Sequence, residues 1–368
     1  MKLIYLTSQK YPSNKVDPFY WKVMAEAFCD ILKKDFVFII RGEIPRDLKH
    51  INVKSLNFPY HARSLFYFIS MPVLVFLNKW NNTEIIFFSA DPYLLSILIF
   101  WRKVFWFKYK ICSDWHQLFN DWRDSYVSVN SDYLICTSNK LKSLIISKHK
   151  INLNKVRVVY GGVDQKIFIE KSKIDPKKLR ENLSLPPNEF LVGYVGGFRS
   201  VGMEKGIDTM IESLAFLDQS IKMVFVGGSK KHIEEYMELA RKKQVEERCI
   251  FVEKQSFDKV VEFEIALDVL VIPYPNKAHF RDYGFPLKIW EYMASGRPIV
   301  YSNLEIIKEV LDKRAVSFEP SNEKSLADSI NKIYNNQEFV TNSLLNRKEV
   351  ELYTWQAKAS NIINFIQE

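Results

Sequence analysis

Short, continuous apolar segments alternate with amphipathic ones along both halves of the chain, and this alternation constrains the fold more than any other feature. The apolar segments have the length and the β-branched and aromatic content typical of buried strands. They are 2–8, 35–42, 84–90, 108–114 and 132–138 in the first half, and 190–197, 222–228, 249–254, 268–274 and 298–302 in the second. Helical patterns lie between them, at 20–34, 206–217, 233–244 and 286–295. A strand, helix, strand order with short turns predicts an α/β fold with parallel sheets and helices on both faces.

The chain length and a polar segment near the middle predict two domains. A chain of 368 residues suffices for roughly two domains of ordinary size. The segment from Lys171 to Glu189 is polar and contains prolines, so the junction is expected close to it. We expect two Rossmann-like domains, at 1–168 and 169–350, and a C-terminal segment at 351–368. Ligands of open α/β sheets bind beyond the carboxyl ends of the strands, so functional residues are expected in the loops that follow them.

Composition and cysteine spacing exclude several classes of protein. Apolar residues make up 47% of the chain and charged residues 26%, as in a soluble globular protein. The four cysteines lie far apart with no CxxC pair, which argues against a zinc site and a disulfide framework, and we expect them to be reduced and buried. The apolar run after Lys2 is too short for a signal-peptide core, so we expect a cytoplasmic protein.

The net positive charge of the chain comes from its first half. Residues 1–170 contain 24 Lys and Arg against 14 Asp and Glu, whereas the remainder contains 28 against 29. The same half contains two segments that mix aromatic, aliphatic and cationic residues, Ser64 to Trp80 and Tyr93 to Lys110. Neither reaches the ~20 apolar residues of a spanning helix. They fit peripheral contact with an anionic membrane, or, as the alternative for each segment alone, the core of a large α/β domain.

The loop after strand 190–197 carries the first candidate anion site. Gly196 and Gly197 end the strand, Arg199 and Lys205 follow, and Gly206 leads into a helix. Backbone amides at a helix start with two cations beside them suit a phosphate or diphosphate. The pattern is neither the P-loop nor the GxGxxG fingerprint. The alternative is that Lys205 is an ordinary solvated lysine.

The second candidate anion site lies in the segment "DYGFPLKIWEYMASGRPIV", residues 282–300. Pro286 suits the first turn of a helix and Gly296 its C-terminal cap, which predicts a helix from Pro286 to Ser295. Lys288 then lies in the first turn beside backbone N–H groups, and Glu291 lies three residues later on the same face. A cation for phosphate and a carboxylate for two vicinal hydroxyls fit a nucleoside diphosphate. The alternative is a surface ion pair between the two.

These segments together resemble a known family. "DYLICTSNKLKSLI", "VRVVYGGVDQKIF", "GYVGGFRSVGMEKGIDTMIESL" and "DVLVIPYPN", followed by "YGFPLKIWEYMASGRPIV", are similar in content and order to glycosyltransferase family 4, retaining enzymes of the GT-B fold. The resemblance is strong from about Asp132 onward. It implies two Rossmann-like domains whose sheets face each other across a cleft, with an acceptor bound by the first domain and a nucleotide-sugar donor by the second. The closing "YTWQAKASNIINFI" resembles the family's final helix, which packs back on the first domain.

The resemblance assigns roles to individual residues. Lys205 matches the lysine of the family's "KG" motif, and Arg199 its diphosphate-binding arginine, with one extra residue between the two. Glu291 matches the second glutamate of the E-x7-E motif, which holds the ribose. His116, in "ICSDWHQLF", matches a histidine that contacts the transferred sugar.

The chain departs from the family at Tyr283, where the first motif glutamate is usual and where the adjacent Asp282 is a candidate replacement. The expected catalytic residues are therefore His116, Arg199 and Lys205. The expected donor-binding residues are Gly197, Arg199, Lys205, Asp282, Tyr283, Gly284, Phe285, Pro286, Leu287, Lys288 and Glu291.

The function expected from this resemblance is retaining, metal-independent transfer of a sugar from a nucleotide-diphosphate sugar to a membrane-associated or lipid-linked glycan. No cofactor, metal or nucleic-acid partner is expected, and the protein would act from the cytoplasm at the inner face of the membrane. Rival hypotheses are a GT-B nucleotide-sugar epimerase, a phosphorylase, and a non-catalytic glycosyltransferase-like subunit, the last because of Tyr283.

Overall fold

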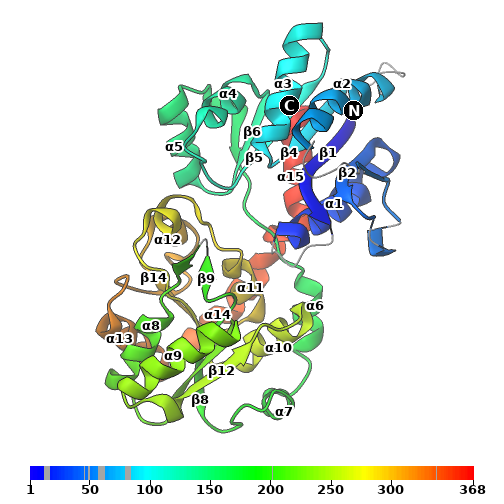
Figure 1. The fold of residues 1–368 in the computed structure, drawn as a ribbon. Coiled ribbons are helices and arrows are strands. Elements are labelled where there is room, and N and C mark those ends of the chain that lie inside the picture. Colours follow the sequence, from blue (N-terminus) through cyan, green and yellow to red (C-terminus); the bar gives the residue numbers. More distant parts are fainter. Residues whose placement is uncertain are drawn as a thin grey trace. The chain divides into compact units, whose positions relative to one another are not determined.

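The computed structural model describes residues 1–11, 17–44, 46–48, 50–56, 63–78, 84–200, 202–336 and 338–368. The chain divides into two compact units, each a parallel sheet covered by helices (Figure 1). The first unit comprises Met1–Gly161 with Trp355–Glu368, and the second comprises Gly162–Thr354. The predicted α/β fold with two Rossmann-like sheets is confirmed.

The first unit contains seven strands in the order β3-β2-β1-β4-β5-β6-β7, all parallel. The strands are β1 Lys2–Tyr11, β2 Phe36–Gly42, β3 Val53–Ser55, β4 Ile85–Ser89, β5 Lys110–Trp115, β6 Tyr133–Cys136 and β7 Val156–Val158. Its helices are α1 Asp17–Leu32, α2 Arg63–Asn78, α3 Pro92–Phe105, α4 Trp122–Asn130, α5 Asn139–His149 and α15 Trp355–Gln367. The C-terminal helix α15 packs against α1, so the chain returns to this unit at its end, as predicted (Figure 1).

The second unit contains six parallel strands in the order β12-β11-β8-β13-β14-β15. They are β8 Phe190–Val195, β11 Ile221–Gly228, β12 Cys249–Glu253, β13 Val269–Ile272, β14 Ile299–Ser302 and β15 Val316–Phe318. A hairpin of β9 Arg199–Ser200 and β10 Met203–Glu204 follows β8. The helices are α6 Gln165–Lys171, α7 Pro176–Asn182, α8 Ile207–Ser213, α9 Lys230–Lys242, α10 Phe257–Ala266, the π-helical turn η7 His279–Tyr283, α11 Lys288–Ser295, α12 Glu305–Leu311, α13 Glu323–Tyr334 and α14 Glu338–Glu349.

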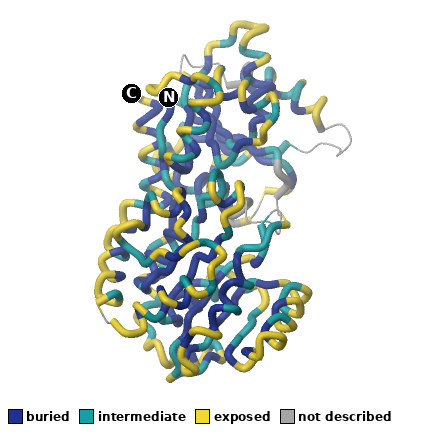
Figure 2. Tube along the Cα trace, turned by 90° about the vertical axis from the view of Figure 1, so that its left-hand side faces the viewer, coloured by how far each residue is buried: buried dark blue, intermediate teal, exposed yellow. Residues whose placement is uncertain are grey.

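Both sheets are buried on two faces, which explains why their strands read as continuous apolar runs. Figure 2 shows the strands as buried and the exposed positions on the helices and loops around them. Sequence reasoning missed the two-residue strands β9 and β10 and, in the two large sheets, β3, β7 and β15, which have three residues each and lie at sheet edges. All four cysteines are free, as predicted, but only Cys112 and Cys136 are buried, whereas Cys29 and Cys249 are half-buried.

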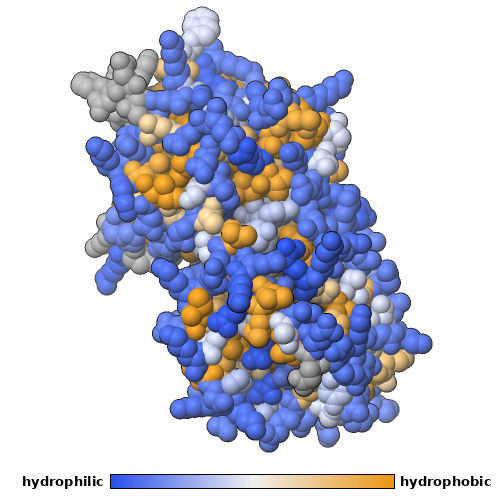
Figure 3. Space-filling view, turned by 180° about the vertical axis from the view of Figure 1, so that it is seen from behind, coloured by the Kyte–Doolittle hydropathy of each residue, from blue (hydrophilic) through white to orange (hydrophobic). Residues whose placement is uncertain are grey.

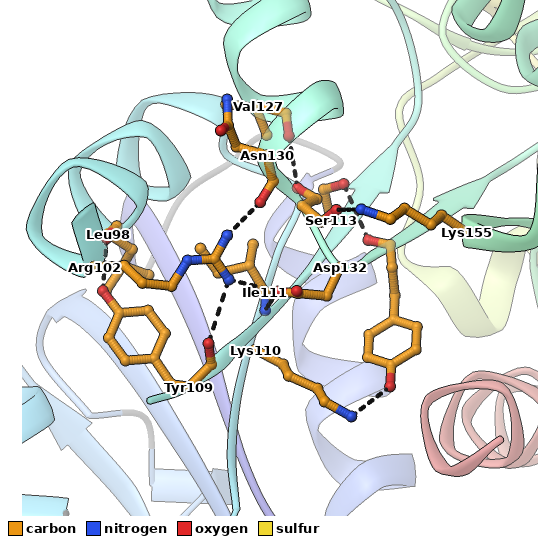
Figure 4. A network of polar contacts seen from close by, with 12 residues as sticks. Leu98, Arg102, Tyr109, Lys110, Ile111, Ser113, Val127, Asn130, Asp132 and Lys155 are labelled. Carbon is orange, nitrogen blue, oxygen red and sulfur yellow. Dashed lines mark hydrogen bonds and ion pairs between the residues drawn. The ribbon is translucent and has the colours of Figure 1, made fainter. Parts of the chain in front are cut away.

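Helix α3 of the first unit combines core and surface roles. Its residues Leu94–Ile99 are buried, and its last turn is tied down by Arg102 (Figure 4). The Arg102 guanidinium pairs with Asp132 at 2.5 Å and donates to the carbonyl oxygens of Tyr109 and Asn130. Asp132 in turn accepts from the backbone N–H of Ile111 at 2.8 Å. The segment is therefore partly core, as the alternative reading held, and part of its positive charge is used within the fold.

Candidate functional site

The candidate site of the second unit lies where its chain order reverses. From β8 the sheet grows to one side through β11 and β12 and to the other through β13, β14 and β15. In open parallel sheets, ligands bind at the carboxyl ends of the strands at such a switch point. Gly196 and Gly197 follow β8, and Pro273 and Tyr274 follow the neighbouring β13. The starts of α8 and α11 meet these two strand ends, as the glycine contacts below show.

Two glycines make this edge of the sheet possible. Gly196 has φ +146°, and a Cβ added there would lie 2.1 Å from Lys288 Cε and 2.3 Å from its Nζ. Gly206, with φ +85°, would place a Cβ 1.9 Å from the carbonyl oxygen of Pro273. Both positions therefore need glycine for conformation and for close approach. Gly197 is less constrained, because its Cβ would meet nothing nearer than 3.7 Å.

Lys205 and Lys288 are brought close together at these strand ends. Burial lowers the pKa of Lys205 to about 8, and the positive charge of Lys288 adds to the shift. Their ammonium groups lie over aromatic rings: Lys205 is 5.6 Å from the Tyr274 centroid, and Lys288 is 5.6 Å and 5.8 Å from those of Tyr194 and Tyr292. Two cations sharing a partly desolvated site repel each other, and an anion bound between them would relieve that repulsion.

Glu291 lies one turn along α11 from Lys288, and their Oε2 and Nζ atoms are 3.8 Å apart. The side chains are only 14% exposed for Lys288 and 20% for Glu291, so this is not a solvated surface pair of the kind worth a few tenths of a kcal/mol. The same helix corrects a predicted boundary, because α11 begins at Lys288 rather than at Pro286. Its end is as predicted, since the C-cap Gly296 has φ +70°.

A buried carboxyl that sequence reasoning missed lies close to this pair. Glu264 of α10 is fully buried, and neither of its carboxyl oxygens has a hydrogen-bond partner in the described part of the chain. Burial and the negative charge of Glu291 raise the pKa of Glu264 far above its usual range, although Lys288 opposes the shift. The surroundings of Glu264 therefore disfavour its negatively charged form. Nothing in its local sequence, inside an apolar helix, distinguishes it from a solvated glutamate.

Arg199 is engaged by carboxylates of its own. Its guanidinium contacts Glu204 at 3.0 Å, across the hairpin, and Glu235 of α9 at 2.7 Å. No contact joins it to Lys205 or Lys288 within the described residues. Its positive charge is therefore already compensated by two carboxylates, whereas Lys288 faces the carboxylate of Glu291 at 3.8 Å, which is longer than a hydrogen bond.

The segment 279–287 forms a π-helical turn, His279–Tyr283, and a short irregular connection to α11. Asp282 makes a bidentate pair with Arg281, and Phe285 stacks on Trp290 with centroids 5.9 Å apart. Pro286 is buried, and Tyr283, Gly284 and Leu287 are half-buried. His279, which the sequence did not single out, belongs to this site: burial lowers its pKa, and the charge of Lys205 adds to the effect.

His116 lies in the first unit, directly after β5. Its Nε2 is 3.0 Å from Asp114 Oδ2, and the Tyr20 hydroxyl donates to the same oxygen at 2.8 Å. Lys358 of α15 is buried nearby, with Nζ 5.4 Å from the centroid of Tyr20. Sequence reasoning found the histidine but not its three neighbours, of which only Asp114 is close enough in sequence to have been noticed.

A separate cavity of about 520 Å³ lies at the other end of the second sheet. It is lined by residues at the amino ends of β8 and β13, and the ion pair between Arg180 and Asp268 closes part of it. Arg180 is fully engaged there, because it also donates to the carbonyl oxygens of Ala266 and Glu189. This cavity lies at the amino ends of the strands, opposite the carboxyl ends that carry the paired lysines.

The two parallel sheets in separate units, with a helix that returns to the first unit, define the GT-B fold. Residues 175–348 match the family model of glycosyl transferases group 1. This match covers slightly less than half of the chain; it confirms the predicted resemblance to glycosyltransferases but does not single out family 4.

Individual relatives agree with this assignment. The O-antigen biosynthesis glycosyltransferase WclY of Escherichia coli is 26% identical over 209 residues, which cover 54% of this chain and 55% of that protein. The chain thus spans about half the length of the curated relatives it matches. Among solved structures, Anabaena HepE in complex with UDP superposes with a TM-score of 0.78 at 15% identity over 100% of both chains. WaaG, a glycosyltransferase involved in lipopolysaccharide biosynthesis, superposes with a TM-score of 0.69 at 14% identity over 99% of both chains. At such identities the structural likeness shows the fold alone.

Proposed function

We propose that this protein is a glycosyltransferase whose second unit binds a nucleotide-diphosphate sugar. The observation that carries the proposal is the pair of Lys205 and Lys288 at the switch point of the sheet, with Glu291 one helical turn beyond. Paired, partly desolvated cations favour a multivalent anion such as a diphosphate. A carboxylate at Glu291 can accept hydrogen bonds from both hydroxyls of a ribose. The UDP bound by HepE, which shares the fold, supports a donor of this class.

The proposed reaction retains the configuration of the sugar. The bond from the sugar C1 to the β-phosphate oxygen breaks, the acceptor oxygen bonds to C1 on the same face, and the acceptor proton passes to the departing phosphate oxygen. Negative charge grows on the diphosphate, and Lys205, Lys288 and the N–H groups at the start of α11 stabilise it. Arg199 would join them once a donor competes with Glu204 and Glu235. These groups supply the charge without a metal ion.

His116 of the first unit is proposed to contact a substrate hydroxyl. Under this proposal, the region 1–168 binds the acceptor and 169–350 the donor, and the C-terminal segment 351–368 completes the first domain. The donor site would be lined by residues 282–287 together with His279.

The proposed acceptor is a glycan carried by a membrane, as in O-antigen or lipopolysaccharide synthesis, the processes named for WclY and WaaG. A surface of the first unit supports this proposal. Apolar side chains are exposed along α2 and at the end of α3, namely Leu65, Phe66, Ile69 and Val73, and Val104, Phe105 and Trp106. The space-filling view shows hydrophobic surface interrupting the hydrophilic surface over this unit (Figure 3).

Two exposed cations accompany this surface, which is called here the α2/α3 surface. Lys103 and Lys108 are exposed beside Trp106, whose side chain is 86% exposed. Apolar side chains next to lysines suit peripheral binding to anionic lipids. No helix in the described ranges has the length and apolar character required to cross a bilayer. We propose that the α2/α3 surface rests on the cytoplasmic leaflet and brings the first unit to its acceptor.

The second candidate function is a non-catalytic glycosyltransferase-like subunit, favoured by Tyr283 at the position of the first motif glutamate. A nucleotide-sugar epimerase of the same fold is a third. The purified chain should consume the donor if it is an active glycosyltransferase and should not consume it if it is a non-catalytic subunit. Formation of an epimerised sugar nucleotide in the absence of acceptor identifies the third.

A panel of UDP-, GDP- and ADP-sugars tests the proposal. One of them should raise the melting temperature by several degrees, because a ligand at 100 times its Kd stabilises a protein by about 2.7 kcal/mol. The same sugar nucleotide should be consumed when a lipid-linked glycan is added. Failure of every sugar nucleotide to stabilise the chain would contradict the proposal.

A further inference from the structure

A carboxylate lies behind His116, in the interior of the first unit. Asp114 belongs to β5, and its side chain is 0% exposed, whereas that of His116 is 39% exposed. Asp114 Oδ2 receives the hydroxyl of Tyr20 at 2.8 Å and lies 3.0 Å from His116 Nε2. The Tyr20 ring also packs edge-on against the imidazole, with centroids 4.8 Å apart and planes at 88°. Three elements, β5, α1 and the loop after β5, therefore hold the imidazole in one orientation.

The C-terminal helix supplies one of the charges, beside that of His116, that keep this carboxylate ionised. Lys358 of α15 is buried, donates to the carbonyl oxygen of Val159 at 3.4 Å and lies over the ring of Tyr20. Burial alone would raise the pKa of Asp114, but the charges of His116 and Lys358, with the hydrogen bonds from His116 and Tyr20, outweigh it and lower the pKa to about 2. Asp114 is therefore a carboxylate at any pH at which the protein would act.

An ionised Asp114 decides which nitrogen of a neutral His116 carries the proton. A carboxylate has no proton to donate, so the short contact between its Oδ2 and Nε2 requires the proton on Nε2. The other ring nitrogen, Nδ1, then keeps its lone pair. A carboxylate or carbonyl that accepts from one nitrogen fixes the role of the other in the same way in metal and catalytic sites.

We propose that Asp114 is a positioning residue that holds His116 as the Nε2–H tautomer, so that its free Nδ1 accepts a hydrogen bond from a substrate hydroxyl. The proposal deepens the proposed function and rests on it for the identity of the substrate. It names a polarity for the contact: the partner of His116 must be a donor, such as a sugar hydroxyl, and not a carbonyl or phosphate oxygen. Lys358 is the remote member of the arrangement, because it stabilises the carboxylate without reaching the imidazole.

The test combines the proton position with kinetics. Nitrogen-15 NMR of the full chain, with the His116 resonances assigned by their loss in His116→Asn, should show Nε2 protonated and Nδ1 unprotonated in the neutral ring. In Asp114→Ala this preference should disappear, and kcat/KM should fall about 10- to 100-fold, the scale for removing a carboxylate that orients a histidine. Asp124→Asn is the matched control, because the Asp124 carboxylate is also buried but accepts from the backbone N–H groups of Phe119 and Asn120, with no histidine bonded to it among the described residues. This variant should leave the tautomer unchanged.

Asp114→Ala leaves Lys358 buried without its partner and can fail to fold. The double variant Asp114→Leu with Lys358→Met removes both charges together and keeps the measurement possible. In that background, adding His116→Ala should cost much less than it costs in the wild-type chain, because the two residues act as a unit. A proton on Nδ1 in the wild-type chain, or equal costs of His116→Ala in both backgrounds, would overturn the inference. A chain that transfers no sugar would contradict the proposed function instead, and the NMR result would still decide the tautomer.

Discussion

The two units each contain a buried carboxyl group beside a candidate site, and the two respond to burial in opposite ways. Asp114 in the first unit has a pKa lowered to about 2, because His116, Lys358 and Tyr20 outweigh its burial. Glu264 in the second unit has a raised pKa, because burial and the negative charge of Glu291 act in the same direction. Desolvation disfavours the charged form in both, so the neighbouring charges decide the outcome.

The opposite pKa shifts of the two carboxyl groups indicate what each candidate site is suited to bind. In the second unit, the surroundings of Glu264 disfavour its charged form and two lysines share the candidate site, which suits an anionic donor. In the first, the negative charge of Asp114 is matched by Lys358, so His116 is oriented without giving the site a net charge. One region attracts a charged ligand, and the other directs a single hydrogen bond.

Removing the paired cations should give the largest effect. Lys288→Ala and Lys205→Ala should each lower kcat by about 100- to 1,000-fold, the scale for losing one preorganised group that stabilises charge in the transition state. Neither should lower the melting temperature appreciably, because removing one of two repelling cations does not destabilise the fold. A fall in stability that parallels the fall in kcat would show that the lysines are structural.

Gly196→Ala offers a test of the same site that deletes no charged group. The added Cβ would meet Lys288 Cε at 2.1 Å, and the φ of +146° is itself unfavourable for alanine. Displacement of the ammonium should reduce turnover nearly as much as Lys288→Ala does. Gly197→Ala is the matched control for this packing contact, because its Cβ would meet nothing nearer than 3.7 Å, and a much smaller loss of turnover is expected. Equal effects of the two substitutions would contradict the close packing of Lys288 on Gly196.

Glu291→Ala should weaken binding of the nucleotide sugar by about 1 to 3 kcal/mol, the scale for hydrogen bonds to a charged group. That corresponds to roughly 5- to 150-fold in Kd. Inorganic diphosphate has no ribose and should bind Glu291→Ala no more weakly than it binds the wild-type chain. Calorimetry with both ligands measures the contrast, and wild-type affinity for the nucleotide sugar would remove Glu291 from the site.

The pH dependence of donor binding should be smaller but diagnostic. Lys205 has a pKa of about 8 in the free protein, below its ordinary value. It is protonated below that pH and loses its charge as the pH rises through it, so affinity for a nucleoside diphosphate should fall above pH 8. Lys205→Arg should flatten this part of the profile, because arginine stays charged. A profile between pH 7 and 9 that is identical in the two proteins would exclude Lys205 as the titrating group.

Membrane attachment should respond least to single changes. Lys103→Ala and Lys108→Ala should each weaken binding to anionic liposomes by about 1 kcal/mol, and raised salt should weaken it further. Trp106→Ser tests the apolar part of the α2/α3 surface, with Lys177→Ala in the second unit as the control. Flotation that is equal for anionic and neutral liposomes, or absent for both at low salt, would contradict a membrane role for this surface.

The sequence could predict the parts of this molecule that depend on local patterns. The ten longer strands, the end of α11 at Gly296, and the i,i+3 placement of Lys288 and Glu291 all follow from short segments. The beginning of α11 could not be placed, because Pro286 fits an extended stretch as well as a first helical turn. Short edge strands such as β15 have too few residues for a periodicity.

The parts that could not be predicted depend on residues far apart in the chain. Lys358 lies 244 positions after Asp114, and only the return of α15 to the first unit brings them together. Glu264 and His279 join the candidate donor site because α10 packs against α11 and the segment after β13 lies near Lys205. The ion pairs of Arg199 likewise require the approach of α9 to the β9/β10 hairpin.

The most direct test of the account is calorimetric titration of the full chain with UDP-, GDP- and ADP-sugars, without added metal, beside the double variant Lys205→Ala with Lys288→Ala. We expect one sugar nucleotide to bind the wild-type chain, and we expect the double variant to stay folded but to bind it at least two orders of magnitude more weakly. Binding of equal strength to both proteins, or no binding of any sugar nucleotide to the wild-type chain, would contradict a donor site at the paired lysines.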